Sequence, residues 1–388
     1  MTTPGWTRRA FIQWLAATVG ALVVGQCTPD ESARSPLPVL PDAGRAPPPT
    51  PWPLHPARFW QPLADGSVQC WLCFRGCVVP EGRLGFCRNR KNVGGAYFTK
   101  VYGRATAIQV DPIEKEPLFH MLPGQRILGV ATASCNFRCR GCQNWELSQR
   151  SVDEVISEPA TPAQLAERAI QEGCVAISFT YNEPTVFYEY MTDTAREARL
   201  RGLRTLCHTN GAMRQAPLRA LLPVLDAIVV DLKGFEETYY ARVSQAALAP
   251  VLDTLQEIHQ AGTHLEVVHL LIPTLNDDPA ITRRMCAWLV EHVGPDTPLH
   301  FLRFFPAYKL QRLPPTPLET LEAAAALAEA EGLRYVYIGN MPGHARNSTY
   351  CPTCRQRVIT RAHLATVSMD LADGRCRFCG TAIPGLWQ

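Results

Sequence analysis

Three cysteines with CxxxCxxC spacing, Cys135, Cys139 and Cys142, follow an apolar run of β-strand type over residues 127–133. Cysteine thiolates are the usual protein ligands of iron–sulfur clusters. A four-iron cube held by three cysteines keeps one iron open, on the same logic that leaves a catalytic zinc an open coordination position. A structural zinc site is the alternative, but no histidine lies close in sequence to complete a tetrahedron. The pattern therefore predicts a catalytic [4Fe–4S] cluster on this loop.

Most of the other cysteines, out of 15 in the chain, form two further sets whose CxxC-type spacing indicates metal binding rather than disulfides. The first set lies in a glycine-bearing loop and would close a tetrahedral site for zinc or hold an auxiliary iron–sulfur cluster, with zinc preferred. The second is typical of a zinc ribbon. The first set is Cys70, Cys73, Cys77 and Cys87, the second is Cys351, Cys354, Cys376 and Cys379, and single cysteines in apolar contexts, typical of inert buried thiols, are Cys174, Cys207 and Cys286.

The elements that must position these cysteines divide the chain into parts of different composition. Residues 1–27 place Arg8 and Arg9 before an apolar stretch and resemble a twin-arginine signal or membrane anchor. Residues 28–53 are proline-rich and predict a disordered linker. The remainder is predicted as an N-terminal cysteine-rich metal-binding segment over 54–126, a barrel domain over 127–340 and a zinc-ribbon-like tail over 341–388.

From residue 127 onward, apolar runs of buried-strand type alternate with segments of helical periodicity, which is typical of a parallel α/β fold. We expect a partial (β/α)6 barrel, with one further strand at 335–340. Thr161 and Pro162 predict an N-cap and a first-turn proline. The strands are expected at 127–134, 174–181, 204–209, 227–232, 264–272 and 299–305, and helices at 161–172, 184–201 and 317–331.

Polar residues follow these strands, at the carboxyl ends where parallel barrels gather functional groups. Glu183 is a candidate ligand, with capping of the next helix as its alternative role, and His300 is more typical of a packed residue. The segment Asp111 to His120 is expected to be a solvated loop, with Lys115 and His120 facing the site as the alternative. The candidates are Tyr181, Asn182, Glu183, His208, Asn210, Asp231, Lys233 and Tyr308.

Together these motifs resemble the radical S-adenosylmethionine (SAM) superfamily, and closely resemble the AmmeMemoRadiSam-system radical SAM enzymes, which are related to the pyruvate formate-lyase activating enzymes. The resemblance spans nearly all of residues 54–388. Glycyl-radical activases carry an aspartate where this chain has His208, and a histidine where it has Tyr308. The matching segments are Cys70 to Cys87, Asp111 to His120, Cys135 to Glu146, Tyr181 to Pro184, His208 to Gly211, Asp231 to Gly234, Arg303 to Lys309 and the Cys351 to Cys379 ribbon.

The resemblance implies a [4Fe–4S] cluster and SAM as cofactors. Glu183 would accept a hydrogen bond from the SAM ammonium group, and Lys233 would contact its carboxylate. The enzyme would cleave SAM reductively to methionine and a 5′-deoxyadenosyl radical, which abstracts hydrogen from an unknown substrate, such as a protein. The resemblance further implies an electron donor such as flavodoxin or ferredoxin, and a partner or substrate of the Ammecr or Memo type.

Two alternatives to this function stay open. One is a glycyl-radical-enzyme activase. The other is a membrane-tethered iron–sulfur electron-transfer protein, which would need neither Glu183 nor the Asp231 and Lys233 pair. The formal net charge of +3 is too small to indicate nucleic-acid binding, and none is predicted.

The predicted location depends on which part of the chain is considered. SAM and a strong reductant predict a cytoplasmic enzyme, whereas the N-terminal signal predicts one that is membrane-associated or exported by the twin-arginine route. A membrane tether reconciles the two, and genuine export or a start codon further downstream are the alternatives.

Overall fold

The computed structural model describes residues 52–388. The predicted signal (1–27) and nearly all of the predicted linker (28–53) lie outside the described residues. Within residues 52–388, none of the helices combines the length and the apolar character that a bilayer crossing requires.

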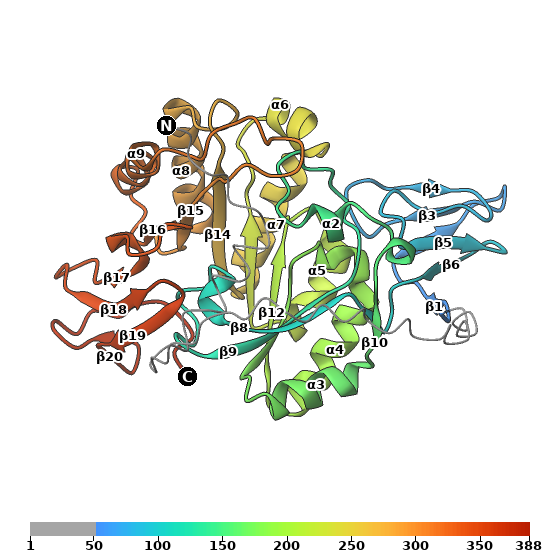
Figure 1. Cartoon of the computed structure of the whole chain (residues 1–388), viewed down its shortest axis with the longest axis horizontal. Coiled ribbons are helices and arrows are strands. Elements are labelled where there is room, and N and C mark those ends of the chain that lie inside the picture. The colour runs from blue at the N-terminus through green and yellow to red at the C-terminus, as the bar shows by residue number, and fades with distance from the viewer. Residues whose placement is uncertain (1–51) are drawn as a thin grey trace, which may run out of the picture. The chain divides into compact units, whose positions relative to one another are not determined.

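A single large sheet forms the centre of the described structure (Figure 1). Its strands are β8 (Ala107–Pro112), β9 (Arg126–Ala131), β11 (Ala176–Phe179), β12 (Arg204–Thr209), β13 (Ala227–Asp231), β14 (His264–Leu271), β15 (Leu299–Arg303) and β16 (Val336–Gly339). The order is β16-β15-β14-β13-β12-β11-β9-β8, and every pairing from β9 to β16 is parallel. β8 adds to β9 in the antiparallel direction. The predicted strands are thus confirmed, and the sheet is open, with β16 and β8 at its edges.

Helices connect the parallel strands and form a continuous layer, because α3 packs on α4, α5 on α7, α7 on α8 and α8 on α9. Their bounds are α3 (Pro162–Gln171), α4 (Tyr188–Leu200), α5 (Gln215–Leu221), α7 (Ala249–Ala261), α8 (Pro279–Val293) and α9 (Leu318–Ala330), with short helices α2 (Trp145–Ser148) and α6 (Glu237–Tyr239). Thr161 caps α3 in a reciprocal capping box with Gln164. The predicted helix at 184–201 begins instead as a 3₁₀ turn, η3 (Pro184–Phe187), before α4.

The segment between β8 and β9 covers the inner face of the sheet, so the predicted solvated loop is wrong. Its apolar residues Ile113, Leu118 and Met121 form one buried cluster with strand residues such as Ile127 and Val229. Packing these three apolar side chains against the sheet removes them from water, whereas a solvated loop would leave them exposed. As a result the polar side chains between them are carried into the interior, where Glu114, Glu116 and His120 are 2%, 3% and 0% exposed.

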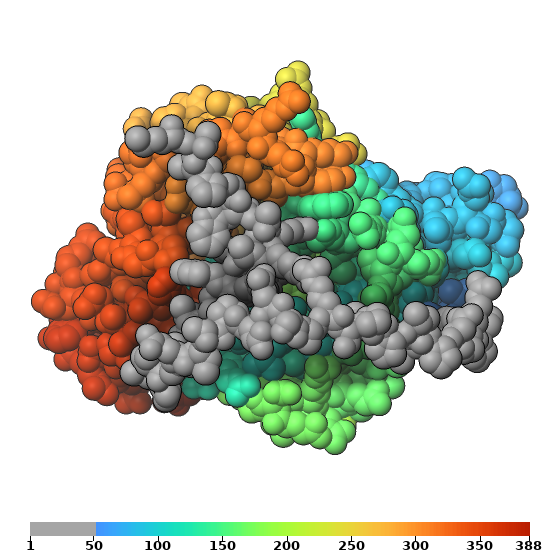
Figure 2. Space-filling view, viewed as in Figure 1, coloured from blue at the N-terminus to red at the C-terminus, as the bar shows by residue number. Residues whose placement is uncertain are grey.

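Small sheets flank the large one. The N-terminal cysteine-rich segment contains β1 (His55–Pro56), β2 (Trp60–Pro62), β3 (Val68–Cys70), β4 (Val78–Val79), β5 (Arg90–Val93) and β6 (Ala96–Thr99), while β7 (Arg104–Ala105) pairs with β10 (Glu158–Pro159). The tail contains β17 (Thr349–Tyr350), β18 (Arg357–Ala362), β19 (Ala365–Met369), β20 (Leu371–Ala372) and β21 (Arg375–Cys376). Within residues 52–388, the part that carries β1 to β6 (blue) and the tail (red) lie at opposite ends (Figure 2).

Candidate active site

The three-cysteine loop, residues 135–142, leaves the carboxyl end of the sheet just after β9. Its backbone is fixed from outside: the N–H groups of Arg138 and Arg140 donate to the carbonyls of Ser244 and Val243, each at 2.9 Å. These carbonyls end a short π-helical turn, Tyr240–Ser244, whose last carbonyls have no partner within the turn. Phe137 is buried and meets Phe74 edge to face. The loop is therefore held by a neighbouring element as well as by its own sequence.

The three cysteines are half-buried, and desolvation raises the pKa of each thiol. For Cys135 the nearby Glu183 carboxylate adds to this effect. For Cys139 burial raises the pKa to about 11 although the Lys233 cation opposes it, and Cys142 is raised for the same dominant reason. Cys139 and Cys142 also raise the pKa of Cys135, and Cys142 raises that of Cys139. Thiols in this environment become thiolates when a metal replaces their protons.

The loop fits an iron–sulfur cluster rather than a single metal ion. The three thiols are close enough to influence one another, yet their sulfurs do not converge on one point: among residues 52–388, only the four tail cysteines have ligand atoms all within 4.8 Å of one another. Thiolates bound to different irons of a cube must stand apart. Cys135, Cys139 and Cys142 would hold a [4Fe–4S] cluster, with one iron left for another ligand.

Glu183 lies at the carboxyl end of β11 and is 3% exposed. Its Oε1 accepts hydrogen bonds from the Thr185 N–H (3.0 Å), the Thr185 hydroxyl (2.5 Å) and the Thr209 hydroxyl (2.7 Å), while Oε2 accepts the Asn210 N–H at 2.8 Å. The contact to Thr185 caps η3, so the helix-capping role expected as the alternative is present. Oε2 keeps acceptor capacity for a further donor, since a carboxylate oxygen has two lone pairs.

Two asparagines join the strand ends to the cysteine loop. Asn210 Nδ2 donates to Asn136 Oδ1 at 2.8 Å and lies 3.7 Å from Cys135 Sγ. Asn182 Nδ2 donates to the Ser134 carbonyl at 2.9 Å. Both side chains are buried, and both act here as positioning residues for the loop.

A chain of charged side chains crosses the ends of β12 and β13. His208 lies 3.1 Å from Glu116 Oε2 through Nδ1 and 3.3 Å from Asp231 Oδ1 through Nε2. Lys233 Nζ donates to Asp231 Oδ2 at 2.8 Å. Burial disfavours both cations, but Asp231 and Glu116 raise the pKa of His208 to about 10, and Asp231 with Cys139 raises that of Lys233 well above its usual range. Both side chains are therefore held positive.

The charge of Lys233 acts both on Asp231 and on two of the loop cysteines. Burial would raise the pKa of Asp231, but Lys233 and His208 hold it well below its usual range. The Lys233 cation lowers the pKa of Cys139 and Cys142. A positive charge thus lies between a carboxylate and two of the loop thiols, where it can neutralise a bound anionic group.

Sequence reasoning missed Glu116, because the segment that carries it was expected to be solvated. Thr180 donates its hydroxyl to Glu116 Oε2 at 2.8 Å, which fixes that carboxylate against His208. Asp111 was also missed: it accepts from the Lys115 ammonium at 2.8 Å and from the Tyr181 hydroxyl. The apolar residues interleaved with these polar ones were the available signal that the segment is buried.

Tyr181 turns back toward the interior of the sheet. Its backbone has a positive φ of 64°, and its hydroxyl crosses Gly129 of β9, where a Cβ would lie 2.4 Å from the hydroxyl oxygen. Glycine at that position is what allows the contact with Asp111. Burial, with the adjacent Asp111, raises the pKa of Tyr181 well above its usual range.

The remaining predicted residues are dispersed. Tyr308 stacks on Trp145 with ring centroids 5.1 Å apart, next to the cysteine loop, whose Arg140 carbonyl accepts the Lys309 N–H. His300 is packed, as expected, with Nε2 2.6 Å from Glu266 Oε2. His120 does not face the site: it is buried against Tyr337, 2.7 Å from its hydroxyl.

The tail cysteines form a compact site of their own. The Sγ atoms of Cys351 and Cys379 are 3.5 Å apart, and those of Cys354 and Cys376 are 3.7 Å apart. These separations suit tetrahedral zinc, for which Zn–S bonds of about 2.3 Å imply sulfurs about 3.8 Å apart. The predicted zinc-ribbon ligands are thus brought together as one group that could hold a metal.

Comparison with known proteins bears on the site directly. The sequence model of the radical SAM superfamily matches residues 130–285, which contain the three loop cysteines, Glu183 and Lys233. The chain is 43% identical over 332 residues to the uncharacterized protein MJ0808 of Methanocaldococcus jannaschii, covering 85% of this chain and 99% of that protein. It is 24% identical over 310 residues to the benzylsuccinate synthase activating enzyme of Thauera aromatica, covering 73% and 91%.

A shorter match reaches a second activating enzyme. The chain is 24% identical over 169 residues to the pyruvate formate-lyase-activating enzyme of Listeria monocytogenes, covering 40% of this chain and 66% of that protein. The matched segments, the parallel sheet and the open three-thiol loop at its carboxyl end agree with one another. The chain therefore belongs to the radical SAM superfamily and is a radical SAM enzyme related to the activating enzymes.

Proposed function

We propose that this enzyme binds SAM at the three-cysteine loop and uses it to abstract hydrogen from a substrate. A [4Fe–4S] cluster on Cys135, Cys139 and Cys142 would supply the electron that cleaves SAM to methionine and a 5′-deoxyadenosyl radical. The observation that carries the proposal is that an acceptor, Glu183, lies near Cys135 and a cation, Lys233, lies near Cys139 and Cys142.

The protein's own groups would orient SAM. Its amino group is cationic and matches Glu183 Oε2, whereas its carboxylate matches the Lys233 ammonium. Because both groups are already held by other partners, little side-chain freedom is lost when SAM binds. Burial of the site limits access of water to the radical.

A glycyl-radical activase is the second candidate, supported by the likeness to two activating enzymes. His208 favours a substrate other than that of a glycyl-radical activase. It places a cation, held by Glu116 and Asp231, at a strand end where those activases carry an aspartate. The electron-transfer alternative is disfavoured, since a carrier has no need of an acceptor and a cation beside an incompletely ligated cluster.

We extend the proposal to the family system, the partner, the electron donor, the tail metal and the membrane tether that the sequence predicted. This extension comprises membership of the AmmeMemoRadiSam system, a partner or substrate of the Ammecr or Memo type, flavodoxin or ferredoxin as donor, zinc in the tail and a tether to the membrane by residues 1–27. A protein substrate agrees with the activating-enzyme likeness.

The test is formation of 5′-deoxyadenosine. The full chain is reconstituted anaerobically with iron and sulfide, reduced with dithionite and incubated with SAM. We expect product from the parent and none above background from Cys139→Ala. Cys174→Ala is the matched control, because this buried cysteine precedes β11 at the opposite end of the sheet. A reducible parent that binds SAM but yields no 5′-deoxyadenosine, with or without candidate partners, contradicts the proposal.

A further inference from the structure

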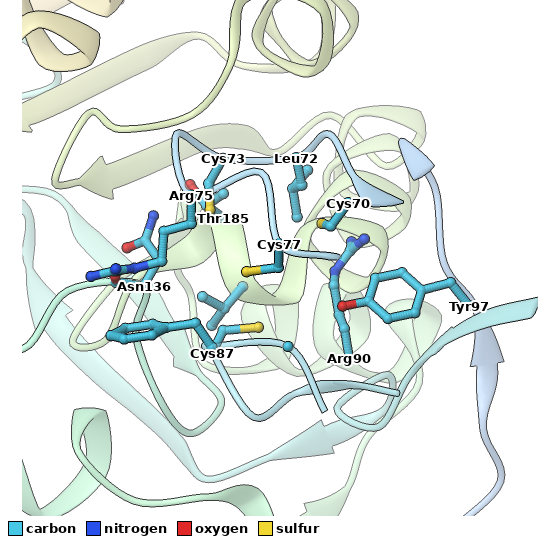
Figure 3. Close-up of a pocket in the computed structure, with 13 residues that line it drawn as sticks. Cys70, Leu72, Cys73, Arg75, Cys77, Cys87, Arg90, Tyr97, Asn136 and Thr185 are labelled. Atoms are coloured by element: carbon cyan, nitrogen blue, oxygen red, sulfur yellow. The ribbon is translucent and has the colours of Figure 1, made fainter. Parts of the chain in front are cut away.

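The N-terminal cysteines surround a space instead of meeting at a point. Cys70, Cys73, Cys77 and Cys87 line one small cavity of about 20 Å³. Figure 3 shows their sulfur atoms pointing into this cavity from different sides. The first three come from β3 and the turn that follows it, and Cys87 comes from the loop between β4 and β5.

This arrangement differs from that of a single zinc site. One zinc requires four sulfurs about 3.8 Å apart, because each Zn–S bond is about 2.3 Å long. The tail cysteines satisfy this requirement, and they are the one group among residues 52–388 that does so. The same molecule thus contains a zinc-like set for comparison, and the N-terminal set does not share its geometry.

The three-cysteine loop is the better comparison. Its sulfurs also fail to converge, as expected when each thiolate binds a different iron of one cube. We propose that Cys70, Cys73, Cys77 and Cys87 hold an auxiliary [4Fe–4S] cluster, fully ligated by cysteine, in place of the zinc that the sequence spacing favoured.

The charges around the cavity suit an anionic cluster. A cluster bound by four thiolates carries net negative charge, which is costly to bury alone. Two guanidinium groups line the cavity, those of Arg75 and Arg90. Arg90 is 1% exposed and pairs with buried Glu189, and Arg75 stacks on Phe86 with its guanidinium carbon 3.3 Å from the ring centroid. Because Glu189 already neutralises Arg90, Arg75 would supply most of the charge that offsets the cluster.

The cavity shares a wall with the catalytic loop. Asn136, the neighbour of Cys135, lines it, and so does Thr185, which donates to Glu183. Arg75 Nε donates to the Asn136 carbonyl at 2.6 Å. The auxiliary cluster would therefore lie next to the loop that carries the catalytic cysteines.

Metal content tests this inference independently of SAM cleavage. In the full-length triple variant Cys135→Ala, Cys139→Ala and Cys142→Ala, prepared anaerobically, we expect about four iron atoms and about one zinc per chain. Dithionite should produce an electron paramagnetic resonance signal of a reduced [4Fe–4S] cluster. Adding Cys73→Ala and Cys87→Ala should remove the iron and leave the zinc. About two zinc atoms with no iron in the triple variant would overturn the proposal.

The parent protein provides a second measurement that needs no variant to fold. We expect about eight iron atoms and about one zinc per chain, and a reduced spectrum that contains the signals of two [4Fe–4S] clusters. About four iron atoms and two zinc atoms would contradict the auxiliary cluster even if 5′-deoxyadenosine forms. Conversely, eight iron atoms without 5′-deoxyadenosine would contradict the proposed function and leave the auxiliary cluster standing.

Discussion

The three-cysteine loop and the C-terminal tail use the same ligand atom in opposite ways. In the tail, four sulfurs converge and saturate one site, and the cysteines Cys351 and Cys376 belong to a small hydrophobic core. At the loop, three sulfurs stay apart, and the surrounding acceptors and cations come from other strands. A closed site contributes its binding energy to folding, whereas an open site keeps a coordination position for a reacting molecule.

The largest expected effects are losses of metal from one of the two regions that leave the metal of the other unchanged. Cys139→Ala should lose iron at the loop and all 5′-deoxyadenosine formation while zinc stays at about one per chain. Cys376→Ala should lose that zinc and destabilise the tail while the loop keeps its iron. Elemental analysis measures the iron and zinc content of each variant, and hydrogen exchange measures the stability of the tail. If Cys376→Ala removed loop iron from folded protein, the two regions would not be independent.

Glu183→Gln should weaken SAM binding about tenfold to hundredfold, since a hydrogen bond to a charged group contributes about 1.5–3 kcal/mol. The amide keeps an oxygen for the Thr185 and Thr209 donors but loses the negative charge. Equilibrium dialysis of SAM against the reconstituted protein measures the change. Glu291→Gln, at an exposed position on α8, is the control. An unchanged SAM affinity would remove Glu183 from the open site.

The His208 chain should make stability depend on pH. Its folded pKa of about 10 lies above the unfolded value near 6.5, so its contribution is complete below pH 6.5 and is lost as pH rises through 10. Urea unfolding should show the parent more stable than His208→Asn by an amount on the order of 2–4 kcal/mol at pH 6. This difference should nearly vanish above pH 10. A difference that does not change with pH would mean that the imidazole is neutral.

The smallest effect is expected at the rim of the open site. Tyr308→Phe keeps the ring stacked on Trp145 and should leave SAM affinity within about twofold. Tyr308→Ala removes the stack and should lower stability by about 0.5–1.5 kcal/mol, measured by urea unfolding of both variants. A large loss of SAM affinity in Tyr308→Phe would instead assign the hydroxyl a direct role.

Local patterns were sufficient for much of the fold. Buried runs such as 227–232 and the Thr161 and Pro162 helix start became β13 and the capped start of α3. Their period and capping chemistry depend on residues only a few positions apart. The prediction for segment 111–120 was wrong because its polar residues are typical of a loop. Ile113 and Leu118 are core residues only because the segment packs against the sheet.

The sequence by itself determined the ligands: cysteine spacing, strand-end residues and the tail pairs are properties of short stretches. The tertiary structure decided what each ligand set can hold, because the separation of sulfur atoms depends on how strands and loops from distant parts of the chain pack. It also brought Glu116 to His208, 92 residues apart in sequence, and placed Arg75 against Asn136, 61 residues away. Such pairings arise from burial of the segments that carry them, which no local pattern encodes.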